Sequence, residues 1–126
     1  MNPILWCTMK ILIVDDSRVA RSNIKKALSG LVNITIFEAE DGKKGWAVVQ
    51  EENPDIIFTD WYMENMDGLA LIRKVRQCNN AVKICMLTSE TNDERQALAK
   101  EEGADYILTK PLKLEELAKA LEYLIG

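Results

Sequence analysis

The sequence contains no histidine among its 126 residues. Without an imidazole group the chain cannot build a Ser–His or Cys–His nucleophile pair, and it cannot bind a metal through histidine nitrogen. Three common kinds of active site are therefore excluded. Any chemistry that the protein performs has to rest on other side chains.

Cysteine is scarce and shows no regular spacing. The three residues are Cys7, Cys78 and Cys85. Their number is odd and no C-x-x-C pattern occurs, so neither a zinc site nor a disulfide framework is indicated. We expect small, buried or half-buried thiols in a reducing compartment.

Positive charge is not in excess either. Sixteen Lys and Arg stand against 20 Asp and Glu, which gives a net charge of −4. Because nucleic-acid binding by a broad surface needs clustered cations, we expect no direct DNA binding. No apolar run approaches the about 18 residues of a membrane span. Residues 4–7 are too short for a signal-sequence core and lack a preceding basic residue, so we expect a cytoplasmic protein without membrane insertion.

The composition that remains is that of an ordinary globular protein, with 48% hydrophobic and 29% charged residues. A chain of 126 residues is long enough for one domain with a real core. No internal repeat, low-complexity segment or linker occurs. We expect residues 1–8 to be an N-terminal extension and residues 9–126 to form the domain.

Five short apolar segments alternate with five amphipathic segments along the chain. The predicted strands are residues 10–14, 33–37, 56–60, 81–87 and 105–109. The predicted helices are residues 17–30, 43–52, 67–76, 91–102 and 114–125. Crossovers of this length make the strands parallel, so the fold class is α/β: a doubly wound, five-stranded parallel sheet with five helices in the flavodoxin-like order 2-1-3-4-5. Helix 91–102 has one large aliphatic residue and is expected to be held weakly.

Polar residues follow the strands at their carboxyl ends, which lie at one edge of a parallel sheet and are where ligands bind in such folds. These residues are Asp15, Asp16, Asp60, Thr88 and Lys110. A single Asp after a strand is usually a helix cap, but five matched exits are harder to explain in this way. Two carboxylates about 4 Å apart repel by roughly 4 kcal/mol at an effective dielectric constant near 20. One lysine cannot offset three acids, whereas Lys110 together with Mg²⁺ can, and Mg²⁺ leaves room for phosphate oxygens. The pattern predicts a site for a phosphoryl group beside a metal.

The chain resembles the receiver domains of the two-component response regulator family, and in size it is most similar to the single-domain chemotaxis type. The resemblance covers residues 9–126. It rests on matching residues at the expected strand exits: Asp15-Asp16, Asp60, residues 63–68, Thr88-Ser89 and Lys110-Pro111.

The resemblance implies that Asp60 is the phospho-acceptor and attacks a phosphohistidine on a histidine kinase or phosphotransfer protein. It implies that Mg²⁺ is bound by Asp16, Asp60 and the Tyr62 carbonyl, with Asp15 acting through a water. Lys110 is expected to pair with Asp60 before the reaction and with a phosphoryl oxygen after it. Because the chain has no histidine, it cannot be the phosphohistidine donor.

The resemblance also implies a switch. Thr88 and Ser89 would bind the phosphoryl group, and Tyr106 matches an aromatic residue that turns inward behind the threonine in the family. The surface of helix 91–102, the fifth strand and the last helix would then control a downstream protein. The bond before Pro111 resembles the family's cis peptide. Such a protein is a switch that turns over no external substrate, and we expect a monomer before phosphorylation.

Two features depart from the family pattern. Met63 is followed by Glu64 where proline is frequent, which adds a charge at the rim of the site. Tyr62 and Glu90 stand two residues beyond the acceptor and two beyond the threonine, where the family's side chains flank the path of the hydrolytic water. A bulky Tyr62 predicts a long-lived phosphorylated state. Trp61 is expected to pack locally and to report Mg²⁺ binding by fluorescence.

Three other classes of protein share features with this sequence. An aspartate-nucleophile phosphatase would need a D-x-D-x-T pattern, which the residues after Asp60 do not supply. A flavin- or nucleotide-binding module would need a Gly-rich phosphate loop after the first strand, where this chain is acidic. A receiver cut from a longer regulator, with its output domain elsewhere, is excluded by no feature of the sequence.

Overall fold

The protein is described here by a computed structural model that covers residues 8–78 and 81–125, in which five strands alternate with five helices. The strands are β1 (Met9–Val14), β2 (Ile34–Ala39), β3 (Ile56–Asp60), β4 (Lys83–Thr88) and β5 (Tyr106–Thr109). The helices are α1 (Arg18–Leu28), α2 (Gly42–Glu52), α3 (Gly68–Cys78), α4 (Asp93–Glu102) and α5 (Leu114–Ile125).

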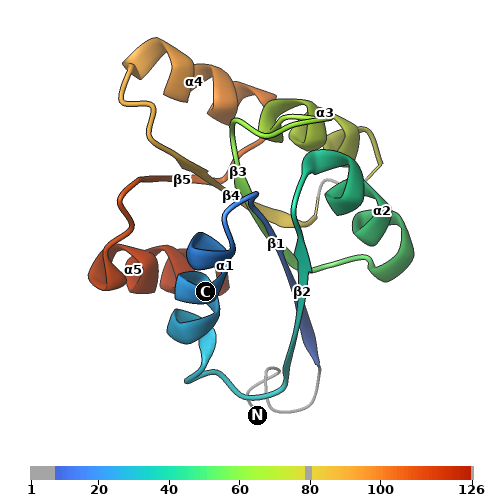
Figure 1. Ribbon diagram of the computed structural model, residues 1–126, viewed down its shortest axis with the longest axis vertical. Coiled ribbons are helices and arrows are strands. Elements are labelled where there is room, and N and C mark those ends of the chain that lie inside the picture. Colours follow the sequence, from blue (N-terminus) through green and yellow to red (C-terminus); the bar gives the residue numbers. More distant parts are fainter. Residues whose placement is uncertain (1–7, 79–80, 126) are drawn as a thin grey trace.

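All strand pairs are parallel, and the order in the sheet is β2-β1-β3-β4-β5. Helices α1 and α5 cover one face of the sheet, while α2, α3 and α4 cover the other (Figure 1). The predicted doubly wound fold is therefore confirmed. Strand β3 lies in the middle, between β1 and β4.

The central strand is apolar along its length because both of its faces are covered. All five residues of β3 are buried. Ile57 packs into the core under α2, α3 and α4, whereas Phe58 packs into the core under α1 and α5. Successive side chains of a strand point to opposite faces, so a strand buried on both sides needs a continuous apolar run.

Polar side chains cap four of the helices at their first turns, and Asp67 does so for α3. Ser17 accepts a hydrogen bond from the Ala20 N–H at the start of α1, and Asp41 accepts one from the Lys44 N–H at the start of α2. Asn92 does the same for α4, so that helix begins at residue 93, two residues later than predicted. Capping groups of this kind set a helix start because they bond N–H groups that have no partner within the helix.

Helix α4 is the least buried of the five helices. Ala99 is its one buried residue, as the sparse apolar pattern predicted. By contrast, α5 buries a full stripe formed by Leu117, Ala120, Leu121 and Leu124. Few core contacts anchor α4, so its position depends more on polar contacts at its two ends.

Two smaller expectations have mixed outcomes. Cys85 is buried as expected, and burial raises the pKa of its thiol, but Cys78 is exposed because it is the last residue of α3 and borders an open hollow. Residues 1–7, which include Cys7 and nearly all of the predicted N-terminal extension, lie outside the described residues. In the part of the chain that is described, no helix has the length and apolar character needed to cross a membrane.

Candidate functional site

The parallel register brings four strand ends to one edge of the sheet. Val14 pairs with Thr59, Asp60 pairs with Leu87, and Thr88 pairs with Thr109. The polar residues predicted from the strand exits therefore follow neighbouring strands at the same level. The contacts described below bring Asp15, Asp16, Asp60 and Lys110 together, and the register places Thr88 at the end of the neighbouring strand β4.

Three carboxylates form a compact group at this edge. Asp15, Asp16 and Asp60 each place one oxygen so that all three atoms lie within 4.8 Å of one another. Asp15 is fully buried and Asp60 is 8% exposed, whereas Asp16 lies at the surface. The Lys110 ammonium lies 3.0 Å from an oxygen of Asp15 and 3.3 Å from an oxygen of Asp60.

The charges of this group do not balance. Burial raises the pKa of the Asp60 carboxyl, the nearby negative charge of Asp15 raises it further, and Lys110 only partly opposes both. Burial works against the charged form of Lys110, but its hydrogen bond to Asp15 and the negative charges of Asp15 and Asp60 outweigh this and raise its pKa. One permanent cation thus faces three acids, and a deprotonated Asp60 is held at a free-energy cost.

The donor atoms of this group suit a hard divalent ion. The described acids offer carboxylate oxygen only, which is the ligand type that Mg²⁺ and Ca²⁺ prefer. The two oxygens of Asp15 already accept hydrogen bonds, one from the Ser17 N–H at 2.9 Å and one from Lys110. Asp16 is exposed and better placed to receive an ion from solvent. The cluster could therefore hold a metal ion.

The turn after β3 is fixed against the start of α3. The Gly68 N–H donates to the Trp61 carbonyl at 2.7 Å. A Cβ atom at Gly68 would lie 2.0 Å from the Asp60 carbonyl oxygen, so a side chain cannot fit there. Asp67 accepts from the Ala70 N–H at 2.8 Å and caps the helix. Trp61 is 1% exposed and packs locally, as predicted.

Thr88 is fully buried, and its hydroxyl oxygen accepts a hydrogen bond of 2.9 Å from the Glu90 N–H. Ser89, next to it, is exposed at the surface. The predicted cis bond between Lys110 and Pro111 is present.

Tyr106 does not lie where the sequence interpretation placed it. Its ring packs with the α1 and α5 core and lies 5.5 Å from the ring of Tyr123 on α5. Met86 and Thr88 are two residues apart on β4, so their side chains point to the same face of the sheet. Met86 belongs to the core against which Ile107 packs, which lies on the other face from Tyr106. The match along β5 was thus displaced by one residue, and a displacement of one residue in a strand changes the face of the sheet.

The two residues predicted to flank the path of water are brought together. The Tyr62 hydroxyl donates to a Glu90 carboxylate oxygen at 3.3 Å and accepts from the Arg95 guanidinium at 2.9 Å. Arg95 was missed by sequence reasoning, because an exposed arginine on a helix 33 residues away carries no sequence signal for this contact. Glu64 is exposed and borders, with Asp16, an open hollow of about 510 Å³, which agrees with its predicted place at the rim.

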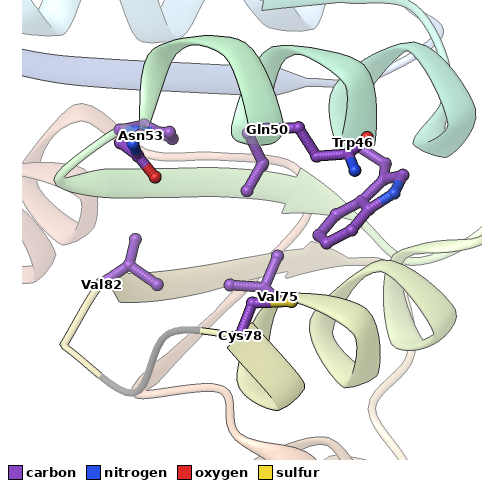
Figure 2. Close-up of a pocket in the computed structure, with 8 residues that line it drawn as sticks. Trp46, Gln50, Asn53, Val75, Cys78 and Val82 are labelled. Carbon is purple, nitrogen blue, oxygen red and sulfur yellow. The ribbon is translucent and has the colours of Figure 1, made fainter.

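A smaller apolar hollow of about 120 Å³ lies elsewhere in the molecule, between α2 and α3. Figure 2 shows Trp46 and Gln50 of α2 facing Val75 and Cys78 of α3 across it. Asn53 and Val82, which also line it, precede β3 and β4. The hollow therefore lies toward the amino ends of these strands, away from the carboxylates.

Comparisons with known proteins agree with this fold. Residues 11–122 match the model of the response regulator receiver domain. The chain therefore belongs to this family of two-component signalling proteins. It is 36% identical over 122 residues to the chemotaxis protein CheY1 of Helicobacter pylori, a match that covers 94% of this chain and 98% of that protein.

Other relatives show two sizes of protein. The structure of the chemotaxis protein CheY4 of Vibrio cholerae superposes with a TM-score of 0.84 at 32% identity, covering 94% of this chain and 99% of that one. The response regulator MprA of Mycolicibacterium vanbaalenii is 30% identical over 93% of this chain, but the match covers 50% of MprA. Receivers similar to this chain thus occur both alone and within longer proteins.

Proposed function

We propose that the chain is a phosphorylation-dependent switch in which Asp60 accepts a phosphoryl group from a phosphohistidine on a histidine kinase or phosphotransfer protein. An Asp60 carboxylate oxygen forms a bond to phosphorus while the phosphorus–nitrogen bond breaks, and its electron pair stays on the partner's imidazole. The observation that carries this proposal is the desolvated Asp60 carboxylate, 8% exposed and incompletely compensated at the end of β3. The product is an acyl phosphate on Asp60.

The residues present fit a bound Mg²⁺, with Asp16, Asp60 and the Tyr62 carbonyl as direct ligands and Asp15 acting through a water. When bound, the ion offsets negative charge on the transferring group. Lys110 lies close enough to Asp60 to donate to a phosphoryl oxygen once the carboxylate is modified. Thr88, and Ser89 beside it, would donate to another oxygen after Thr88 exchanges its present contact with the Glu90 N–H.

The output surface in this proposal is formed by α4, β5 and α5 and controls a downstream protein. Helix α4 suits such a role because Ala99 is its one buried residue, so a small displacement exposes little apolar surface. On the face of the sheet that contains Thr88, coupling through β5 would involve the aliphatic Ile107. The monomeric resting state and the cytoplasmic location stay predictions.

A second form of the same proposal is a receiver within a longer regulator, with a separate output domain. The partial coverage of MprA favours this form. The length of the native reading frame distinguishes the two. The Mg²⁺-dependent phosphatase is a remote alternative, and it would release more than one phosphate per protein from an aryl phosphate ester.

Labelling with a small phosphodonor tests the proposal. The protein is incubated with an acyl phosphate or phosphoramidate and Mg²⁺, and the phosphoprotein is resolved on a phosphate-affinity gel. We expect labelling of the wild type and none of Asp60→Asn. Asp55→Asn is the matched control, because Asp55 immediately precedes the same strand and should leave labelling intact. No labelling of the wild type, or undiminished labelling of Asp60→Asn, contradicts the proposal.

A further inference from the structure

Three side chains form a bridge beside the acceptor that links two loops to α4. Tyr62 follows β3, Glu90 follows β4, and Arg95 lies in the first turn of α4. The Tyr62 hydroxyl is bonded to both of the others, at 2.9 Å from Arg95 and 3.3 Å from Glu90. We call Tyr62, Glu90 and Arg95 the Tyr62 bridge.

Arg95 contacts both Tyr62 and the neighbouring Trp61. Its guanidinium donates to the hydroxyl, and the same group lies 4.9 Å from the centre of the Trp61 ring. The Tyr62 ring is stacked on Trp61 with a centroid distance of 5.6 Å and an angle of 16°. Because Trp61 is buried and directly follows Asp60, the guanidinium and the tyrosine ring are both held against the residue next to the acceptor.

The remaining part of the bridge is also held in place. Glu90 accepts from the Asn92 N–H at 3.1 Å, and its backbone carbonyl accepts from the side chain of Gln96 at 2.8 Å. The Glu90 N–H reaches the Thr88 hydroxyl at 2.9 Å. The bridge therefore spans the ends of β3 and β4, which carry Asp60 and Thr88 respectively.

Without the bridge, the stack on Trp61 would be the remaining contact described for the Tyr62 ring. The side chain is 48% exposed, and an exposed aromatic ring at a loop samples several rotamers in water. The family resemblance puts Tyr62 beside the path of the hydrolytic water, so a ring that is free to swing away would leave the proposed acceptor open to solvent for part of the time. Its ability to exclude water therefore depends on the contacts made by its hydroxyl.

From these contacts we infer that Arg95 is a positioning residue that sets the lifetime of the phosphorylated state, by holding Tyr62 across the approach of water to Asp60. The inference rests on the proposed function. In the reaction that it slows, a water oxygen forms a bond to phosphorus and the bond between phosphorus and the Asp60 carboxylate oxygen breaks. The electron pair stays on the carboxylate, and the water gives its proton to the departing phosphate or to solvent.

The test compares five proteins: the wild type, Arg95→Ala, Tyr62→Phe, the double variant and Arg73→Ala. Each is labelled with a small phosphodonor and Mg²⁺, the donor is removed, and loss of the phosphoprotein is followed on a phosphate-affinity gel. Arg73→Ala is the matched control because Arg73 also joins α4, through an ion pair with Glu102 of 3.0 Å at the other end of the helix.

We expect Arg95→Ala and Tyr62→Phe each to dephosphorylate about 3-fold to 10-fold faster, which is the range given by the loss of one hydrogen bond. The double variant should be no faster than Tyr62→Phe, because loss of the Tyr62 hydroxyl already removes its contact with Arg95. Arg95→Ala should also alter the near-ultraviolet circular dichroism of the unphosphorylated protein, since the Trp61–Tyr62 stack loses its cover. Arg73→Ala should match the wild type in both measurements.

The outcomes separate this inference from the function on which it rests. Normal labelling with an unchanged rate of loss in Arg95→Ala overturns the inference and leaves Asp60 as the acceptor. Additive effects in the double variant also overturn it, because Arg95 would then act by another route. Absence of labelling in all five proteins overturns the proposed function and the inference together.

Discussion

At the amino edge of the sheet, Arg76 of α3 donates to the carbonyls of Val82 and Gly103 and to the carboxylate of Asp105, at 2.8 to 3.1 Å. At the carboxyl edge, Lys110 faces Asp15 and Asp60, with Asp16 close by. Both edges therefore hold one cation against carboxylate. The first has one negative charge for its cation, and the second has three.

The difference separates a structural clamp from a site for chemistry. The Arg76 clamp joins α3 to the segments that precede β4 and β5, and Asp105 also accepts from the Ile84 N–H at 2.8 Å. Each of its groups has a partner in the fold. At the carboxyl edge the fold leaves negative charge for a ligand to compensate. Unbalanced charge near the end of a buried strand therefore indicates function better than the mere presence of an ion pair does.

Removal of the Arg76 clamp should have the largest effect on stability. Arg76→Met should lower the free energy of unfolding by about 3 kcal/mol, because Asp105 and two carbonyls lose their charged donor. Chemical denaturation with and without Mg²⁺ measures this, and the loss should be the same in both conditions. Restoration of stability by Mg²⁺ would show that the two edges do not differ in the way described.

Removal of Lys110 should lower the free energy of unfolding, and Mg²⁺ should restore it. Lys110→Met is expected to lose about 2 kcal/mol in a chelating buffer, because the buried Asp15 is left beside Asp60 without a counter-charge. Mg²⁺ should then stabilise this variant more than it stabilises the wild type, since no lysine competes for the carboxylates. Equal stabilisation of the two proteins by Mg²⁺ would contradict this expectation.

In the wild type, the two edges of the sheet can be distinguished by measuring stability with and without Mg²⁺. At a Mg²⁺ concentration ten times its dissociation constant, the free energy of unfolding should rise by about 1.4 kcal/mol. Asp16→Asn should lose most of this gain. Glu40→Gln, in which the altered acid borders the same open hollow, should keep it, so that a general effect of negative charge is distinguished from coordination.

The smallest expected effect concerns Asp60, the proposed acceptor. In a chelating buffer at neutral pH, Asp60→Asn should be more stable than the wild type by on the order of 1 kcal/mol, because it removes a desolvated charge beside Asp15. The folded state raises the Asp60 pKa and so binds the proton more tightly than the unfolded state does. The wild type therefore loses stability as the pH rises from the unfolded pKa through the folded one.

The stability difference between Asp60→Asn and the wild type should therefore grow as the pH rises from the unfolded pKa of Asp60 to its folded pKa. It should shrink as the pH falls through the same interval. Denaturation curves at several pH values measure the effect. Glu64→Gln, which alters an exposed acid at the rim, should change stability by less than about 0.5 kcal/mol at each pH. A Glu64→Gln variant that equals Asp60→Asn would assign the effect to overall charge.

Much of the fold and of the candidate site could be predicted from local pattern. The apolar run before Asp60 indicates a strand buried on both faces, and the amphipathic segments indicate where the helices lie. Because parallel strands end at one edge, residues that directly follow or end them converge whatever the details of packing. This is why Asp15, Asp60 and Lys110 could be brought together from their positions in the chain.

The positions of Tyr106 and Arg95 could not be predicted from local pattern. The face on which Tyr106 lies depends on the register of β5 against β4, and one residue reverses it. The contact of Arg95 with Tyr62 depends on how α4 lies across the loops, because nothing in either segment specifies a partner 33 residues away.

The sequence by itself determined the order of the strands' polar exits and hence the kind of chemistry that this protein can support. The alternation of side chains is a property of each strand, and the length of the crossover segments makes the strands parallel. Tertiary structure alone decided that Asp60 is desolvated, that Lys110 divides its charge between two acids, and that Arg95 lies over the ring of Trp61. Burial and distance are properties of the packed elements, and they determine the energies of these groups.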